Sequence, residues 1–194
     1  MFRGNKPVLI LPGILMVVMI LGGYHFLQQE EMITNERLPE VMEMEVDKTP
    51  TDDGVRVEAN WDWTTMPEEG MYGEDYIGIT VTDPATGEPR HDLSFAEGQL
   101  ELRYGDQVIE ESAGVTVDNG IIFAFSNKVE ENMTYGNLGS VSVEVVGAEI
   151  ELEQIELHFL HTWVEHSPLV KEDAAFTEPV FDGAANVPHW VMSY

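Results

Sequence analysis

Residues 115–125 read VTVDNGIIFAF, and this stretch is the clearest indication of the fold class. Apolar residues alternate along both halves, and the Asn119-Gly120 dipeptide separates them. An Asn-Gly pair between alternating apolar residues is a strong hairpin signal, because a type I′ turn needs positive φ at both central residues. The stretch therefore predicts two antiparallel strands joined by a type I′ turn at Asn119-Gly120.

The same period of two recurs along most of the chain after residue 54. Apolar and polar residues alternate from Val55 to Trp63, and similar runs lie at 76–82, 100–104, 141–145 and 155–163. The apolar phase shifts by one near Glu153-Gln154, which predicts a β-bulge. About eight or nine short strands are expected at intervals of roughly 8–12 residues. The prediction for residues 55–175 is an all-β, immunoglobulin-like antiparallel β-sandwich.

Residues 76–89 carry a resemblance to known proteins. They read YIGITVTDPATGEP, which resembles small bacterial immunoglobulin-like ectodomains, where a V-x-D-x-x-T-G-x-P phrase is common. Some of those modules stand on a single N-terminal membrane helix and are similar to accessory proteins of respiratory oxidases and of copper handling. The resemblance implies the fold class and covers only this passage.

The N-terminal part is of a different kind. Residues 7–27 include no charged residue, and a helix of that length is roughly 30 Å long, the thickness of a bilayer's hydrocarbon core. Arg3 and Lys6 precede the run, so residues 1–6 are predicted to be cytoplasmic and residues 7–27 to be a transmembrane helix in the lipid bilayer. A cleaved signal peptide is the alternative. The residues around Gly22-Gly23 argue against it, since every possible cleavage site there includes a bulky residue.

The charge of the chain is distributed unevenly. All 36 acidic residues follow residue 27, together with all but two of the nine basic ones, and the formal net charge is −27. A surface this negative repels nucleic acid and anionic headgroups, so neither is an expected ligand. Two explanations of the acidity stay open. One is adaptation to a saline or alkaline environment, and the other is recognition of a partner.

Residues 28–54 are predicted to form an acidic stalk or linker. They are rich in Glu, Met and Thr and are interrupted by Pro39 and Pro50. Met42 and Met44 have the Met-x-Met spacing of some copper-handling segments. The favoured interpretation is that they supply contacts to a neighbouring protein or to the membrane surface.

Four of the six histidines, His158, His161, His166 and His189, lie in the C-terminal part of the chain. Imidazole is a ligand for zinc and copper, so these four are the candidate metal ligands. The alternative is structural. His158 and His161 are three residues apart and point to opposite faces of a straight strand, which favours a buried His161 and a surface His158. A pairing of His166 with His189 through the fold stays open.

Trp61 and Trp63 share one face of the first predicted strand. A solvent-facing pair of indoles could stack on sugar rings or bind a partner. The two residues are in phase with Val55 and Val57, however, which favours packing in the core.

Residues 176–194 are unusually apolar for a chain end. Trp190, Met192 and Tyr194 are therefore candidate partner-binding residues. Two interpretations stay open: a final strand that closes the sandwich edge, and an arm that docks on a neighbouring subunit.

No enzyme activity is predicted. The chain lacks the common serine-nucleophile, zinc-protease and phosphate-loop motifs, and it has no Cys for thiol chemistry or disulfides. Asn132-Met133-Thr134 fits a glycosylation motif that is common by chance. The leading hypothesis is a non-catalytic extracytoplasmic accessory or assembly subunit of a membrane protein complex, acting through protein–protein contacts. The alternatives are a membrane-tethered copper or zinc binding domain and a surface carbohydrate-binding or adhesion module.

Overall fold

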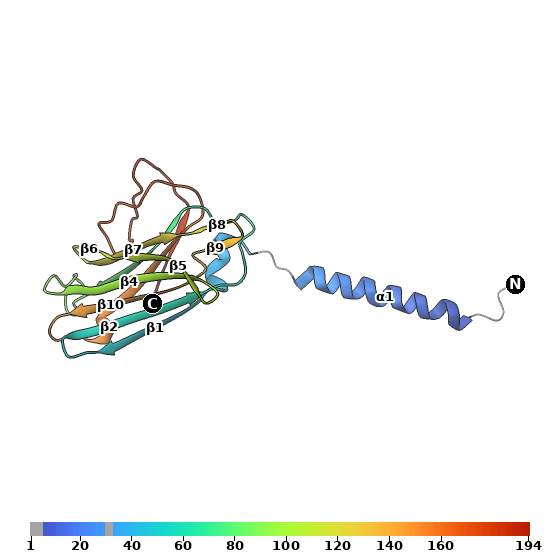
Figure 1. The fold of residues 1–194 in the computed structure, drawn as a ribbon, viewed down its shortest axis with the longest axis horizontal. Coiled ribbons are helices and arrows are strands. Elements are labelled where there is room, and N and C mark those ends of the chain that lie inside the picture. The colour runs from blue at the N-terminus through green and yellow to red at the C-terminus, as the bar shows by residue number, and fades with distance from the viewer. Residues whose placement is uncertain (1–5, 30–32) are drawn as a thin grey trace. The chain divides into compact units, whose positions relative to one another are not determined.

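The computed structural model describes the backbone of residues 6–29 and 33–194 and the side chains of residues 12–24 and 33–194. Residues 1–5, most of the predicted cytoplasmic segment, lie outside this part. The chain divides into two compact units, Met1–Met32 and Ile33–Tyr194, and the second is called the β unit (Figure 1).

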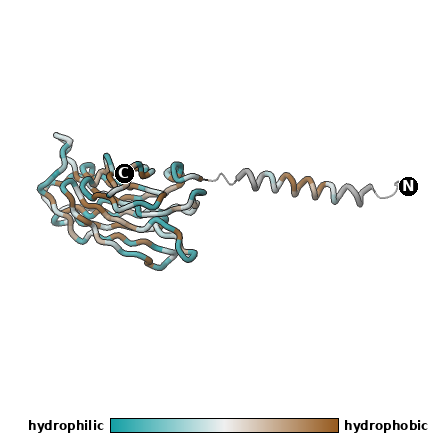
Figure 2. The backbone as a smooth tube through the Cα atoms, turned by 90° about the horizontal axis from the view of Figure 1, so that it is seen from above, coloured by the Kyte–Doolittle hydropathy of each residue, from teal (hydrophilic) through white to brown (hydrophobic). Residues whose placement is uncertain are grey.

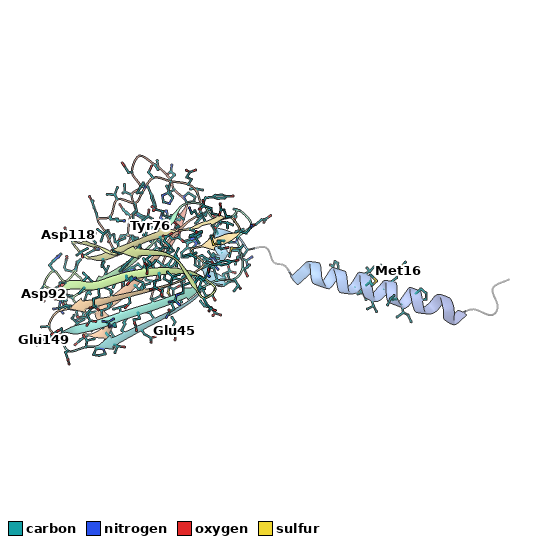
Figure 3. All side chains as sticks on the ribbon, viewed as in Figure 1. Met16, Glu45, Tyr76, Asp92, Asp118 and Glu149 are labelled. Atoms are coloured by element: carbon teal, nitrogen blue, oxygen red, sulfur yellow. The ribbon has the colours of Figure 1, made fainter. Side chains whose placement is uncertain are left out.

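The first unit contains one helix, α1 (Lys6–Gln29). The side chains from Ile14 to Leu21 are all apolar, and each is 54–69% exposed. Figure 2 shows this hydrophobic stretch in the middle of the helix, and Figure 3 shows the Met16 side chain projecting from it. Within the part of the chain that the structure describes, no helix is both long enough and apolar enough to cross a bilayer.

The β unit is built from two five-stranded antiparallel sheets, which confirms the prediction of a mostly β, sandwich-like fold (Figure 1). The first sheet has the order β1 (Glu43–Pro50), β2 (Gly54–Asp62), β10 (Leu138–Val146), β4 (Ser94–Tyr104), β5 (Gln107–Ala113). The second has the order β12 (His189–Ser193), β11 (Ile155–Thr162), β3 (Glu74–Val81), β7 (Gly120–Ser126), β6 (Val115–Val117). The other elements are the ribbon of β8 (Lys128–Glu130) and β9 (Met133–Tyr135), and two 3-10 helices, η1 (Asn35–Glu40) and η2 (Leu152–Gln154).

The main core lies between the two sheets and follows the predicted alternation. On β2, every second residue from Val55 to Trp61 is at most 1% exposed, and the residues between them face outward. The Trp61 ring contacts Phe125 and Phe159 of the opposite sheet, with ring centroids 5.2 and 5.9 Å apart. Because each buried aromatic side chain removes roughly 150–250 Å² from water, this cluster contributes much of the attraction between the sheets.

The β unit begins at Ile33, earlier than the predicted boundary at residue 55. Residues 43–50, predicted as stalk, form β1 and pair with β2 along its length. Met44 and Val46 pack against the core, while the alternating carboxylates of Glu43, Glu45 and Asp47 face solvent. The prediction of a stalk is therefore corrected for this segment. Its acidic residues are the outer face of an edge strand, which acidity alone does not distinguish from a linker.

The predicted hairpin at residues 115–125 is present, but its turn differs from the expected one. Val117 of β6 pairs with Gly120 of β7, so Asp118 and Asn119 form the loop. Neither Asn119 nor Gly120 has a positive φ. Gly120 is needed for close packing instead, because a Cβ at this position would collide with the carbonyl oxygen of Ile79.

The left-handed turn pattern occurs in the β8–β9 hairpin, which the sequence analysis did not predict. Its turn residues Glu131 and Asn132 have φ angles of 48° and 67°. The β-bulge expected near Glu153-Gln154 is absent, and a 3-10 helix occupies this position. Those residues belong to η2, and β11 begins immediately after it at Ile155.

Residues 163–188, called the covering segment, connect β11 to β12 and lie over the outer face of the second sheet (Figure 1, the long brown loop). Leu169, Phe176 and Phe181 of this segment form a second apolar cluster with Tyr76 and Leu160 of the sheet. The central strands of the second sheet are therefore buried on both faces. This explains why almost every residue of β3 is buried.

Gly78 of β3 allows the covering segment to approach the sheet. A Cβ at this position would collide with the carbonyl oxygen of Ala174 and would lie 3.0 Å from the Phe176 ring. We expect Gly78→Ala to lower the free energy of unfolding by about 1–3 kcal/mol, as overpacking substitutions do. Urea unfolding followed by tryptophan fluorescence measures the change. Ser142→Ala on the outer face of the first sheet is the control, and equal effects of the two substitutions would contradict this explanation.

Candidate functional site

The structure separates His158 and His161 as the strand period predicts. They lie on opposite faces of β11, and they are 5% and 0% exposed. His158 is therefore buried, and its predicted surface position is wrong. The reason is the covering segment, which shields a strand face that the sequence pattern assigned to solvent.

His166 and His189 both lie near Phe181, whose ring centroid is 6.4 Å from that of His189, but they have different hydrogen-bond partners. His166 Nε2 is 2.8 Å from Thr162 Oγ1, and its ring packs against Phe181 with centroids 4.5 Å apart. His189 Nδ1 donates to the Val187 carbonyl oxygen at 2.8 Å. Among the residues that the structure describes, no three His, Asp or Glu side chains are placed to share a metal ion. The four histidines predicted as copper or zinc ligands therefore do not form a ligand cluster in the described part of the chain.

The candidate residues Met42, Met44, Trp61 and Trp63 contribute to the core. Met42 is 9% exposed, and Met44 is half-buried against the same apolar cluster. Trp61 and Trp63 are each 1% exposed. The alternative of a sugar-stacking surface on these two indoles is therefore corrected, because both rings lie inside the sandwich.

The C-terminal residues form β12, which pairs with β11 at the edge of the second sheet. Trp190 and Tyr194 pack against the core, and Met192 is half-buried with its sulfur 3.6 Å from the Tyr194 hydroxyl. Residues 176–194 were predicted to be either a final strand or a docking arm, and the structure contains the final strand. The three candidate partner-binding residues make contacts within their own chain.

A fully buried acid–base pair lies at the η1 end of the sandwich. Asp75 of β3 and His161 of β11 are both 0% exposed, and His161 Nδ1 donates to Asp75 Oδ2 at 2.8 Å. Asp75 Oδ1 accepts from the Thr162 backbone N–H at 2.9 Å and from the Asn127 amide at 3.0 Å. The buried carboxylate therefore has three hydrogen bonds, as the burial of a charge requires.

Asn35 of η1 occupies the other side of the imidazole. Its Oδ1 is 3.1 Å from His161 Nε2, and its Nδ2 donates to Glu69 Oε2 at 3.1 Å and to the Gly70 carbonyl oxygen at 3.0 Å. An ionised carboxylate and an amide oxygen only accept, so an ionised Asp75 pairs with a His161 ring that donates from both nitrogens. Asp75 and His161 are then a buried ion pair, with Nδ1 2.8 Å from Oδ2.

Three indoles surround this pair. The centroids of Trp63, Trp163 and Trp190 lie 6.2, 5.8 and 4.8 Å from that of His161. Trp190 Nε1 also donates to the Asn35 carbonyl oxygen at 2.8 Å. An Asp–His pair can serve acid–base catalysis, but this one is shielded from any substrate in solution. The hydrogen bonds around this pair connect η1, at the start of the β unit, to β3, β11 and β12.

The sequence analysis found only part of this arrangement. It predicted a buried, hydrogen-bonded His161 from the strand period but did not identify Asp75 or Asn35. Asp75 directly precedes the apolar run of β3, and a carboxylate in that position was the one available signal. Asn35 lies within the segment predicted as stalk, where nothing local indicates burial.

We expect Asp75→Asn to destabilise the β unit by about 3–5 kcal/mol, because it leaves the charge of His161 buried without its partner. Asp62→Asn is the matched control. Asp62 is an exposed residue of β2, and we expect its substitution to change the free energy of unfolding by less than about 0.5 kcal/mol. Urea unfolding at one pH compares the two. A loss for Asp75→Asn no larger than that of the control would rule out the ion pair.

His158 lies between two hydroxyl groups under the covering segment. Its Nε2 is 3.0 Å from Thr80 Oγ1, and its Nδ1 is 2.8 Å from Ser193 Oγ. Burial lowers the pKa of His158, whereas the carboxylates of Glu156 and Asp173 act in the opposite direction. The lowered pKa means that the folded state favours the neutral ring.

This lowered pKa makes stability depend on pH. The unfolded chain binds the extra proton first, so the contribution of His158 is complete above its unfolded pKa of about 6.5 and is lost as the pH falls below that value. We expect the wild type to lose more stability than His158→Gln between about pH 7 and pH 5, measured by thermal unfolding. The exposed His91→Gln variant is the control. Equal pH slopes for His158→Gln and the wild type would contradict the assignment.

The outer face of the first sheet carries an open hollow of about 840 Å³. Arg56 lies at its border, with Nη2 3.1 Å from Glu97 Oε2 and 3.2 Å from Glu144 Oε2. On this sheet, carboxylates also lie directly opposite one another across neighbouring strands, in the pairs Asp47↔Glu58 and Glu101↔Glu111, and Glu111 lines the hollow. Like charges placed directly opposite each other on a sheet are destabilising.

Further carboxylates lie at the loop end of the β unit, where Figure 3 places Asp92, Asp118 and Glu149. No protein-family model, curated protein or solved structure matches this chain. Its function is therefore argued from residues and geometry alone.

Proposed function

We propose that this chain is a membrane-anchored, non-catalytic accessory or assembly subunit whose β unit acts outside the cytoplasm through protein–protein contacts. The observation that carries the proposal is the apolar surface of α1, since every residue from Ile14 to Leu21 is more than half exposed. Contiguous apolar surface of this kind is normally covered by lipid or by another protein.

The sequence around α1 supports insertion into a bilayer. The uncharged run of residues 7–27 contains the exposed stretch and extends past the described side chains on both sides. Its length matches a transmembrane span. Arg3 and Lys6 lie before it, which supports a cytoplasmic N-terminus and an extracytoplasmic β unit.

The strand order supports an immunoglobulin-like topology for the β unit. A constant-type immunoglobulin domain has strands A, B, E and D in one sheet and C, F and G in the other. If β1, β2, β3, β4, β10, β11 and β12 are taken as A to G, the observed orders β1-β2-β10-β4 and β12-β11-β3 correspond to A-B-E-D and G-F-C. The segment between β4 and β10 is then an insertion that adds strands to both sheets.

The outer face of the first sheet is the surface that we assign to a partner protein. It has an open hollow, and its like-charged pairs Asp47↔Glu58 and Glu101↔Glu111 repel each other in the free chain. A basic partner surface would relieve this repulsion. The second sheet offers no equivalent face, because the covering segment lies over it.

The role of α1 is tested by placing charges in its middle. Each Asp at the centre of a span costs about 2.5–3.5 kcal/mol of insertion free energy, so we expect the double variant Val17→Asp, Val18→Asp to move from the membrane fraction to the soluble fraction. Sedimentation of the full chain after alkaline extraction measures this distribution.

The control for this experiment is Val17→Leu, Val18→Leu, which keeps the helix apolar and is expected to sediment with the membranes. Solubilisation of the wild type in mild detergent then tests assembly, and we expect it to elute as a complex with other proteins. A wild-type chain found in the soluble fraction would contradict the anchor. A chain that elutes only as a monomer would contradict the assembly role.

A further inference from the structure

Residues 132–134 read Asn-Met-Thr, and no other asparagine of the chain is followed by Ser or Thr two positions later. This is the acceptor motif for N-linked glycosylation, which is expected on surface loops of exported proteins. So short a motif also arises by chance. Its structural context therefore decides whether the asparagine is available.

The motif lies at the tip of the β8–β9 hairpin. The two strands pair as far as Glu130↔Met133, so Asn132 is the second residue of a two-residue turn. The Asn132 side chain is exposed, and none of the hydrogen bonds in the described part of the chain uses its amide group. Thr134 follows on β9, half-buried and opposite Val129.

The two asparagines that flank this hairpin are engaged in the fold. Asn127 donates to the Thr162 carbonyl oxygen at 2.6 Å and is fully buried. Asn137 donates to the Trp63 carbonyl oxygen at 3.1 Å. Asn132 differs from both because its side chain is exposed and its amide makes no hydrogen bond within the described part of the chain.

We propose that Asn132 is an acceptor for N-linked glycosylation, an inference that rests on the proposed extracytoplasmic location of the β unit. The co-reactant is an oligosaccharide linked to a lipid diphosphate. Asn132 Nδ2 attacks the anomeric carbon of the first sugar, and the bond from that carbon to the diphosphate oxygen breaks. The amide nitrogen loses one proton, and the lipid diphosphate leaves.

A conformational preference is the competing explanation for an asparagine at this position. Asn adopts the left-handed region readily, and Asn132 has a φ of 67°. Thr134 separates the two explanations, because the turn does not depend on its hydroxyl group but the acceptor motif does. Thr134→Val keeps a β-branched residue and removes the motif, whereas Thr134→Ser keeps the motif.

The test is translation of the full chain in the presence of microsomal membranes that hold an oligosaccharyltransferase and its lipid-linked donor. We expect the wild type to gain one glycan, seen as a mass increase that peptide N-glycosidase reverses. Thr134→Ser should still be modified. Thr134→Val and Asn132→Asp should not be, and Asp is chosen because it also tolerates the left-handed turn.

A second acceptor motif, added as a control, distinguishes a failure of the Asn132 assignment from a failure of the proposed extracytoplasmic location. The double variant Asp106→Asn, Val108→Thr creates a motif at the tip of the β4–β5 hairpin, where both residues are exposed. We expect this variant to gain two glycans. Modification at residue 106 without modification at Asn132 would overturn the acceptor assignment and leave the location intact. Modification at neither position would contradict the extracytoplasmic location and this inference with it.

Discussion

The ion pair between Asp75 and His161 is the interaction on which the arrangement of the β unit depends. Removing these two groups from water costs several kcal/mol per ion, so the pair is tolerated only with its other polar positions satisfied. The Thr162 N–H and the amides of Asn127 and Asn35 satisfy them. These partners come from distant parts of the chain. The hydrogen bonds therefore form together only when η1, β3 and β11 are all in their native places, and Trp190 of β12 closes the same site.

The second sheet shows a related constraint on its outer face. Its apolar residues there are covered by residues 163–188, which have little regular structure of their own, so the contact relies on side chains and on small residues of the sheet. Gly78 leaves room for the Ala174 carbonyl group. Asn119 holds the next part of the segment, donating to Asp173 Oδ1 at 2.6 Å and accepting from the Ala174 N–H at 2.9 Å. The hairpin loop at residues 118–119 is thus an anchor for the covering segment.

The outer face of the first sheet and the surface of α1 are not covered by these interactions. The outer face of the first sheet is polar and bears opposed carboxylates, and α1 exposes apolar side chains from Ile14 to Leu21. The opposed carboxylates repel one another, although Glu101 is paired with Arg103 and Glu111 accepts from Gln99, and the aliphatic side chains have no cover within their own helix. The function proposed above, with α1 in a membrane and the sheet face on a partner, would meet both needs. The Asp75–His161 pair is fully buried and makes its hydrogen bonds within the fold.

Local patterns in the sequence determined the strand character of residues 55–63 and 115–125, the inward position of Trp61 and the opposite faces of His158 and His161. Side-chain alternation is a property of the strand backbone itself, so it can be read without knowing the neighbours. The tertiary structure decided that residues 43–50 are a strand, that His158 is buried, and that Asp75, His161 and Asn35 meet. The last of these joins residues 86 and 126 positions apart in the chain. No local pattern records such pairings, because the burial of a polar side chain depends on what the rest of the chain places over it.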